Sequence, residues 1–246
     1  MIQSVTTGMK KVCFCEGEFH VRTLESEEEL RQAYRLRHRV FAEGLKWVPE
    51  TTNRLETDIY DSWSHSIGVF SEWGRLLGIV RMTQAPVPFM LESEFSACLV
   101  GSHPVRKELD TAEITRLAVD PGITDRSLST QLMCTVIKGA YQWCLAHDIR
   151  YTYLVVEKRL LRALRLMGWP CQPIGEPVAL PPAQAVSVAS LIDLDEFRFN
   201  GAPKRPELLK WYSSVDDRPA ILTDHMPALD QPLSRSVHPQ GEAVYL

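Results

Sequence analysis

The stretch TAEITRLAVDPG (residues 111–122) decides the fold, because a strong strand meets an abrupt stop there. Its apolar and β-branched side chains are typical of strands, and Pro121 followed by Gly122 is a strong chain-breaking signal. The run IRYTYLVVE (149–157) is almost continuously apolar, which favours a central strand covered on both faces. Between the two strands, apolar residues recur at helical spacing: Leu132, Val136, Ala140 and Cys144. The middle of the chain is therefore predicted to be a strand–helix–strand unit.

Segments on both sides extend this unit into an α/β sandwich around one mixed sheet. Ser26 and Glu29 form a capping box that begins a helix, and Gly44 ends that helix. The other predicted elements are a strand within 17–25, a hairpin of 64–70 and 75–83, a helix over 158–168 and a last strand over 185–194. Neither an internal repeat nor a second domain is indicated.

Length and composition are those of an ordinary globular protein. The chain has 246 residues and a mass of 28.0 kDa, enough for one domain with a substantial core. Its net charge of -4 argues against a nucleic-acid binder, which normally carries a basic surface. No apolar run reaches the length of a membrane span, and MIQSVTTGMKK lacks the apolar core of a secretory signal.

The cysteines indicate the compartment. The six cysteines show neither a CxxC pair nor zinc-ligand spacing, so no metal site is expected. Cys134 and Cys144 fall within the predicted helix, which favours buried free thiols in a reducing environment. We therefore expect a cytoplasmic protein.

Three regions are expected along the chain. Residues 1–18 carry little pattern and are expected to be a loosely ordered N-terminal extension. Residues 19–200 contain every predicted helix and strand, and so form the α/β domain. Residues 201–246 hold six of the 16 prolines and no periodic segment, so we expect an irregular, proline-rich C-terminal extension despite Trp211.

Charge gathers in the N-terminal third where apolar residues are expected. Arg37 falls on the apolar stripe of the first helix. The other members of that stripe are Leu30, Ala33, Tyr34 and Phe41. The acidic residues of LETDIYD follow shortly afterwards, namely Glu56, Asp58 and Asp61. Because inward-facing charge is costly unless it is paired or holds a ligand, we expect a polar pocket here, with Trp47 beside it.

These motifs resemble those of the acyl-homoserine lactone synthases, the autoinducer synthases of bacterial quorum sensing. The resemblance runs from about Phe19 to Asp195. The matching segments are YRLRHRVF with Arg37 and Phe41, GLKW with Trp47, LETDIYD with its three acids, GIVRMT with Arg81, PVPFMLESEF, AEITRLAV with Glu113 and Arg116, and LLRALRLMGWP. Their occurrence together and in order makes the resemblance specific.

The resemblance implies a GNAT-type fold, a three-layer α/β sandwich around one mixed, mostly antiparallel sheet. It also implies an N-acyltransferase that joins an acyl group, carried as a thioester on acyl carrier protein, to the amine of S-adenosylmethionine and then lactonises the product. S-adenosylmethionine is then a substrate, and no separate cofactor is expected. The implied catalytic residues are Glu113, Arg116 and Asp58; the implied substrate-binding residues are Arg37, Phe41, Trp47, Glu56, Asp61 and Arg81.

The sequence also bears on which thioester donates the acyl group and on which residues lie near the acyl chain. Acyltransferases of this fold that use coenzyme A usually cradle its pyrophosphate with a glycine-rich loop. The corresponding stretch here, DPGITDRSLSTQ, contains one glycine, so acyl-coenzyme A is less favoured than acyl carrier protein. Lys158, Arg162 and Arg165 share one helix face and are a candidate dock for this acidic carrier, although a solvated surface explains them as well. Tyr153 and Val156 lie near where the family's acyl tunnel is lined, and core packing explains them equally well.

The pair Glu113 and Arg116 tests the proposed site. In a regular strand the two side chains would face opposite sides of the sheet, because side chains alternate. A β-bulge between them would bring both to one face, and bulges are common beside active sites. We therefore predict a bulge near residues 114–116. A purely structural ion pair remains an alternative for these two residues.

Two other functions stay open. A different N-acyltransferase of this fold, such as an N-acyl amino acid synthase or an exosortase-associated acyltransferase, would share much of the acidic loop and the Glu–Arg strand. Trp47 and the proline-methionine-leucine segment favour the lactone synthase. The second alternative is a non-catalytic sensor of acyl ligands, against which the complete set of charged residues argues.

Overall fold

The protein is described by a computed structural model over residues 10–99, 103–201 and 206–215. Its strands are β1 (Cys13–Glu16), β2 (Phe19–Thr23), β3 (His65–Phe70), β4 (Leu76–Gln84), β5 (Thr111–Val119), β6 (Tyr151–Glu157), β7 (Gln172–Pro173), β8 (Val178–Leu180) and β9 (Ala185–Asp193). Its α-helices are α1 (Glu27–Arg37), α2 (Arg126–Ala146), α3 (Lys158–Leu166), α4 (Leu194–Glu196) and α5 (Pro206–Ser213). Shorter turns are π-helical at His38–Gly44 and Phe197–Gly201, and 3₁₀ at Ile59–Ser62, Met90–Glu92 and Ser96–Cys98.

One twisted sheet forms the middle layer of the described chain. Its strands lie in the order β1-β2-β3-β4-β5-β6-β9-β7, and β8 pairs with β9. Within the described residues, β5 and β6 run parallel and the other neighbouring strands run antiparallel. The connection between the parallel pair is α2, as parallel strands require a crossover. The predicted mixed, mostly antiparallel sheet is thus confirmed.

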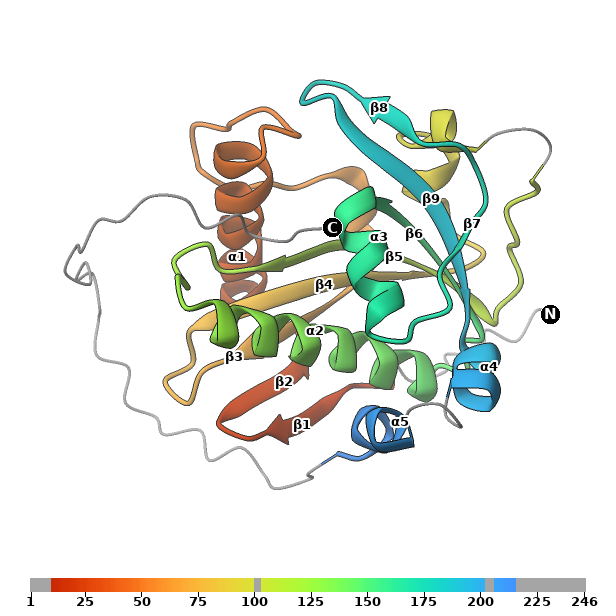
Figure 1. Cartoon of the computed structure of the whole chain (residues 1–246). Coiled ribbons are helices and arrows are strands. Elements are labelled where there is room, and N and C mark those ends of the chain that lie inside the picture. Colours follow the sequence, from red (N-terminus) through yellow and green to blue (C-terminus); the bar gives the residue numbers. More distant parts are fainter. Residues whose placement is uncertain (1–9, 100–102, 202–205, 216–246) are drawn as a thin grey trace, which may run out of the picture.

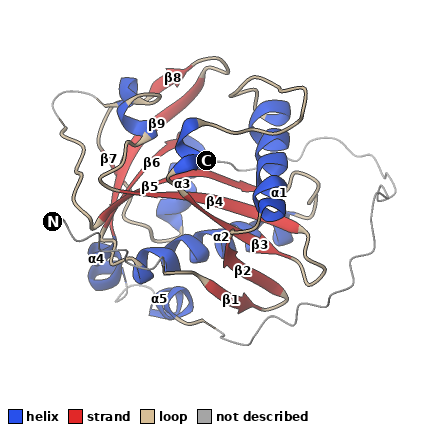
Figure 2. Ribbon diagram, turned by 180° about the vertical axis from the view of Figure 1, so that it is seen from behind, coloured by secondary structure: helices blue, strands red, loops and turns tan. Residues whose placement is uncertain are grey.

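Helices cover both faces of the sheet and complete three layers (Figure 1). α1 lies on one face, and the view from behind shows α2 crossing the other face over β2, β3 and β4 (Figure 2). Two glycines let α2 come close to the strands. A Cβ on Gly78 of β4 would stand 2.6 Å from a Val136 methyl, and one on Gly139 of α2 would stand 3.0 Å from Ile67 and Val21. The largest core cluster fills this layer between α2, α3 and the sheet.

The first helix begins as predicted and changes form where the site begins. Ser26 and Glu29 form the capping box, with the Glu29 amide donating to the Ser26 hydroxyl at 3.2 Å. After Arg37 the helix widens into the π-helical turn that ends at Gly44. Wider turns of this kind are frequent at functional sites. Arg37 therefore lies at the junction of the two helical forms, with its side chain directed to the sheet side.

Two segments differ from the expectations for the chain ends. Within residues 1–18, expected to be loosely ordered, Cys13–Glu16 form β1, because Phe14 is buried in the main core. Within residues 201–246, expected to be irregular, Pro206–Ser213 form α5. The Trp211 indole donates to Glu16 at 2.8 Å and lies 4.6 Å from the Lys138 ammonium, so α5 packs against β1 and α2. The expectation for residues 216–246 lies outside the described residues.

Candidate active site

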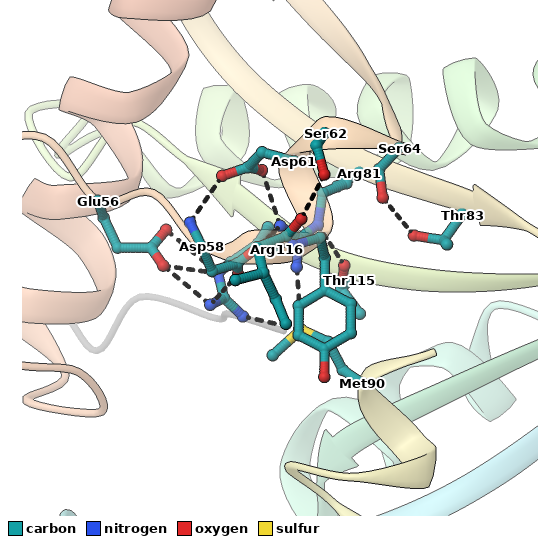
Figure 3. A network of polar contacts seen from close by, with 12 residues as sticks. Glu56, Asp58, Asp61, Ser62, Ser64, Arg81, Thr83, Met90, Thr115 and Arg116 are labelled. Atoms are coloured by element: carbon teal, nitrogen blue, oxygen red, sulfur yellow. Dashed lines mark hydrogen bonds and ion pairs between the residues drawn. The ribbon is translucent and has the colours of Figure 1, made fainter. Parts of the chain in front are cut away.

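Three carboxylates of the loop after the π-helical turn meet three arginines from separate elements. Figure 3 shows the three acids with two of these arginines, Arg81 and Arg116. The acids are Glu56, Asp58 and Asp61. The Asp58 carboxylate accepts a hydrogen bond from the Tyr60 amide at 2.9 Å, and the Asp61 carboxylate accepts one from the Asp58 amide at 2.8 Å. This reciprocal capping of the 3₁₀ turn places two negative charges close together. Such an arrangement is stable only with cations beside it.

Arg37 of α1 binds two carboxylates of the acidic loop. Its side chain is completely buried. Its Nε donates to Glu56, and its two terminal nitrogens donate to Asp61 at 2.6 and 3.2 Å. The Glu56 amide also donates to the Tyr34 carbonyl at 3.1 Å, which ties the loop to α1 a second time. Arg37 therefore holds the acids in place and has no face open to a ligand.

Arg81 of β4 and Arg116 of β5 approach the same carboxylates from the sheet. Arg81 donates through one nitrogen to Asp58 at 2.6 Å and Asp61 at 2.7 Å. Arg116 donates to Glu56 at 2.8 Å and Asp58 at 2.9 Å. Asp58 is thus shared by two arginines, which makes the six charged groups one connected network. The charged residues predicted for catalysis and substrate binding all belong to it, except Glu113.

The predicted bulge in β5 is confirmed. Arg81 pairs with Thr115 and Ile79 pairs with Ala118, so β5 carries one more residue than β4 over this interval. Arg116 occupies the left-handed region at φ 54°, which is uncommon for a residue with a side chain. Because of the extra residue, Arg116 reaches the site face that Thr115 also faces, where the Thr115 hydroxyl accepts a hydrogen bond from Arg81 at 3.0 Å.

Glu113 reaches the network through Met90. Its two carboxylate oxygens accept hydrogen bonds from the amides of Met90 at 2.8 Å and Leu91 at 2.7 Å. The Met90 sulfur in turn contacts Arg81 at 2.9 Å and Arg116 at 3.5 Å. Glu113 thus holds the 3₁₀ turn at Met90–Glu92 against the arginines. The sequence analysis assigned no role to Met90. Its thioether is uncharged, and an uncharged side chain gives no sign in the sequence that it lies beside two arginines.

The two buried glutamates have opposite electrostatic environments. Burial by itself would raise the pKa of Glu56, but the charges of Arg116 and Arg37 outweigh it and lower that pKa to about 2. Burial raises the pKa of Glu113 to about 7, and the amides of Met90 and Leu91 oppose this only in part. Glu56 is therefore a permanent anion, whereas Glu113 can exchange a proton near neutral pH.

The predicted aromatic residues border the network. Phe41 is buried, and its ring centre lies 5.5 Å from the Arg116 guanidinium carbon and 5.9 Å from the Trp47 ring centre. Trp47 is half-buried. These rings place a π face beside the partly exposed end of the network, where a cation can be held.

The two residues expected in an acyl pocket do not share a face. Tyr153 and Val156 are three residues apart on the regular strand β6, so they point to opposite sides of the sheet. Tyr153 packs with Phe89 in a cluster on the α1 side, whereas Val156 lies in the main core under α2. The two side chains therefore belong to different faces of the sheet, and their assignment to an acyl pocket stays a prediction. The neighbour of Tyr153 on its own face is Val155.

The candidate docking face on α3 is exposed. Lys158, Arg162 and Arg165 point to solvent, opposite the buried leucines of the same helix. Arg165 already makes one hydrogen bond within the protein, since its Nε donates to the Cys171 carbonyl at 2.9 Å.

The parallel strands beside the site pair over only part of their length. β5 and β6 pair from Thr111 with Tyr151 to Ile114 with Leu154, and the described register ends there. The bulge at Arg116 follows at once on β5. The sheet therefore loses its continuity between β5 and β6 directly beside the ion network.

Neither a metal cluster nor a membrane helix is found in the part of the chain that the structure describes. In residues 10–99, 103–201 and 206–215, no group of three or more His, Cys, Asp or Glu side chains could hold a metal ion. Over the same ranges no helix is long and apolar enough to cross a membrane.

The sequence comparisons identify one family, and the solved structures share the fold. The sequence model described as Autoinducer synthase matches residues 21–201. The acyl-homoserine-lactone synthase of Aeromonas salmonicida is 33% identical over 185 residues, which cover 74% of this chain and 86% of that protein. The corresponding enzyme of Agrobacterium fabrum is 30% identical and covers 69% and 81%. The solved CoA-dependent acyl-homoserine lactone synthase BjaI with MTA shares the fold, at a TM-score of 0.65 and 21% identity over 85% of this chain and 94% of that chain.

Proposed function

This chain belongs to the autoinducer synthase family and is thus an acyltransferase of the acyl-homoserine-lactone synthase kind, and we propose that it N-acylates S-adenosylmethionine from an acyl thioester and then closes the lactone. The observation that carries the proposal is the connected ion network, joined through Met90 to Glu113 at the interrupted β5–β6 edge. Residues 19–200 are the catalytic domain in this proposal, and the family match over 21–201 supports it.

We place S-adenosylmethionine at the partly exposed end of the network. The side chains of Asp58, Asp61 and Arg116 are 19%, 11% and 10% exposed, whereas Arg37 and Arg81 are buried. The two aspartates attract the sulfonium and ammonium groups, and the nearby aromatic faces favour a cation. Arg37, Arg81 and Glu56 then act as positioning residues that keep these groups in place.

The first chemical step forms an amide. The ammonium of S-adenosylmethionine loses a proton, and its nitrogen attacks the thioester carbonyl carbon. The tetrahedral oxyanion collapses, the carbon–sulfur bond breaks, and the leaving thiolate takes up the second proton that the nitrogen gives away as it becomes an amide. Glu113 is the proposed proton acceptor, directly or through water, because its pKa of about 7 lies near neutral pH. Arg116 is the proposed donor to the oxyanion.

The second step closes the lactone. A carboxylate oxygen of the acylated S-adenosylmethionine attacks the γ-carbon of the same molecule. The bond from that carbon to the sulfonium sulfur breaks, the sulfur takes the electron pair, and methylthioadenosine leaves. This step needs no proton transfer. The protein contributes by holding the chain bent, with its carboxylate near the γ-carbon.

Acyl carrier protein is the proposed donor. The loop 120–131 has a single glycine, and the exposed basic face of α3 suits an acidic carrier. Lys158→Glu and Arg162→Glu test this dock with no loss of a described hydrogen bond, unlike Arg165. Each should raise the KM for the carrier-bound donor several-fold and leave that for the same acyl-coenzyme A unchanged. Equal effects on both donors, or on neither, would contradict the assignment.

The decisive assay measures product and leaving group together. Purified protein is supplied with S-adenosylmethionine and with hexanoyl groups on acyl carrier protein or coenzyme A. We expect methylthioadenosine release to require both substrates, and mass spectrometry to find the N-acyl-homoserine lactone. Acylation of free amino acids without methylthioadenosine would instead support an N-acyl amino acid synthase. Ligand binding without any product would support a sensor.

A further inference from the structure

One loop separates two residues of the candidate active site, Trp47 and Glu56. Residues 48–55 form neither helix nor strand. Lys46 and Arg54, close to the two ends of this loop, occupy the left-handed region at φ 57° and 54°. Such a backbone is costly for residues with a side chain and persists only where the surroundings fix it. The positions of Trp47 and Glu56 therefore depend on the contacts that hold the loop.

Main-chain hydrogen bonds fix both ends of the loop to α1 and its π-helical turn. The Trp47 amide donates to the Phe41 carbonyl at 2.8 Å. The Glu56 amide donates to the Tyr34 carbonyl at 3.1 Å. These two bonds leave the middle of the loop to be held by other contacts.

Thr51 organises the middle of the loop. Its hydroxyl donates to the Leu55 carbonyl at 2.8 Å and accepts from the Leu55 amide at 3.2 Å. Its carbonyl accepts from the Arg54 amide at 3.1 Å. Its own amide donates to Nε2 of His38 at 3.1 Å. Because the first three bonds close the loop on itself, the bond to His38 fixes the loop as a unit to the π-helical turn.

The surroundings of His38 favour this contact. The side chain is buried, and since Nε2 accepts a hydrogen bond, the neutral ring carries its proton on Nδ1. Nδ1 lies 3.2 Å from a Glu43 carboxylate oxygen, without the geometry of a hydrogen bond. The π-helical form allows this approach, because residues five apart are one turn apart there. The carboxylate favours a proton on Nδ1 and so keeps Nε2 available as an acceptor.

We propose that His38 is a positioning residue of the S-adenosylmethionine site, which holds the loop through Thr51 so that Trp47 and Glu56 keep their places. The proposal rests on the proposed function, since that function assigns these two residues to this substrate. Without the bond to His38 the loop is in the binding geometry for a smaller fraction of the time. The apparent affinity for the substrate then falls by that fraction.

The test compares His38→Leu with His38→Gln in steady-state kinetics. Leucine removes the acceptor, whereas glutamine keeps a side-chain oxygen that can accept from the Thr51 amide. The KM for S-adenosylmethionine, the KM for the acyl thioester and kcat are measured separately. We expect His38→Leu to raise the KM for S-adenosylmethionine about fivefold, the effect of losing one hydrogen bond. The other two constants should stay within about twofold of wild type, and His38→Gln should restore most of the lost affinity.

His147→Leu is the matched control. His147 follows α2, which covers the other face of the sheet, and its Nδ1 lies 2.9 Å from the Trp143 carbonyl (Figure 2). This variant should leave the KM for S-adenosylmethionine unchanged. If His38→Leu does not fold, His38→Asn takes its place, because asparagine is too short to reach the Thr51 amide as glutamine does.

The outcomes separate the two proposals. Lactone synthesis by His38→Leu with an unchanged KM for S-adenosylmethionine overturns the role of His38 and leaves the proposed function intact, even where the thermal midpoint falls. An equal rise in KM for both substrates, or a KM that His38→Gln does not restore, also overturns it. Absence of lactone from the wild-type protein with every donor would count against the proposed function. Calorimetric binding of S-adenosylmethionine to wild type and His38→Leu would then decide the role of His38 by itself.

Discussion

Glu113 gives the sharpest test of how the site is built. Its carboxyl is 1% exposed, and burial raises its pKa to about 7 from the reference value of 4.5. The folded protein therefore binds this proton more tightly than the unfolded chain does. The resulting stabilisation is complete below the unfolded pKa and is lost as the pH rises through about 7. Between about pH 5 and about pH 8, these two pKa values correspond to a loss on the order of 2–3 kcal/mol.

Glu113→Gln removes this dependence on pH. Glutamine can accept only one of the two amide hydrogen bonds from Met90 and Leu91, so the variant should be less stable at low pH by about 1–3 kcal/mol. Urea denaturation of both proteins from pH 5 to pH 8 (about four steps) gives the free energy of unfolding at each pH. The difference in free energy of unfolding between wild type and variant should shrink by about 2–3 kcal/mol over this range.

The control is Glu92→Gln, on the same turn but exposed to solvent. It reports how much an exposed carboxylate of this turn contributes to the pH dependence. A difference between wild type and Glu113→Gln that stays constant with pH would refute the electrostatic reasoning. A difference that grows with pH would show that the amides and Arg81 stabilise the anion more than burial opposes it.

Three further predictions follow from the same contacts. Arg37→Met leaves Glu56 and Asp61 without their buried partner and should lower the free energy of unfolding by about 3–5 kcal/mol in urea, with Glu56→Gln added in the double variant restoring part of the loss. Arg116→Gly should abolish synthesis. Its free energy of unfolding should nevertheless exceed that of Arg116→Ala by about 1 kcal/mol in urea, because φ is 54° at this position and glycine adopts such a conformation without strain. Leu164→Ala truncates a buried side chain of α3 and should lower the free energy of unfolding in urea by about 2–5 kcal/mol, whereas the exposed Leu166→Ala should have little effect.

The sequence was sufficient to predict β2, β3, β4, β5, β6 and β9, the first helix and the gathering of charge near it, but not β1, β7 or β8. Arg37 in an apolar stripe could only be stable with buried acids beside it, and Glu56 and Asp61 now fill that need. The bulge could be predicted because side chains alternate along a strand. Glu113 and Arg116 are three residues apart, so only an extra residue between them brings both side chains to one face of the sheet. These inferences depended on local spacing and on the cost of unpaired charge, both of which are visible in a linear chain.

The parts that failed depend on contacts distant in the sequence. The strand at Cys13–Glu16 and the helix at Pro206–Ser213 support each other through Glu16 and Trp211, and neither segment has a strong pattern alone. The assignment of Tyr153 and Val156 together did not take the alternation of β6 into account, which places the two side chains on opposite faces. Met90 became a site residue only because Glu113 fixes its backbone beside two arginines.

The bulge at Arg116 serves the ion network and the main core at the same time. Before it, Ala112 and Ile114 face the α2 side; after it, Leu117 and Val119 do, so the extra residue changes which positions point to each face. The same extra residue that brings Arg116 to the acids therefore places Leu117 in the main core. It also lies where the described pairing of β5 with β6 ends. Deleting one residue here would move Arg116 or Leu117 to the wrong face, so that either the acids would lose a partner or the core would lose a buried side chain.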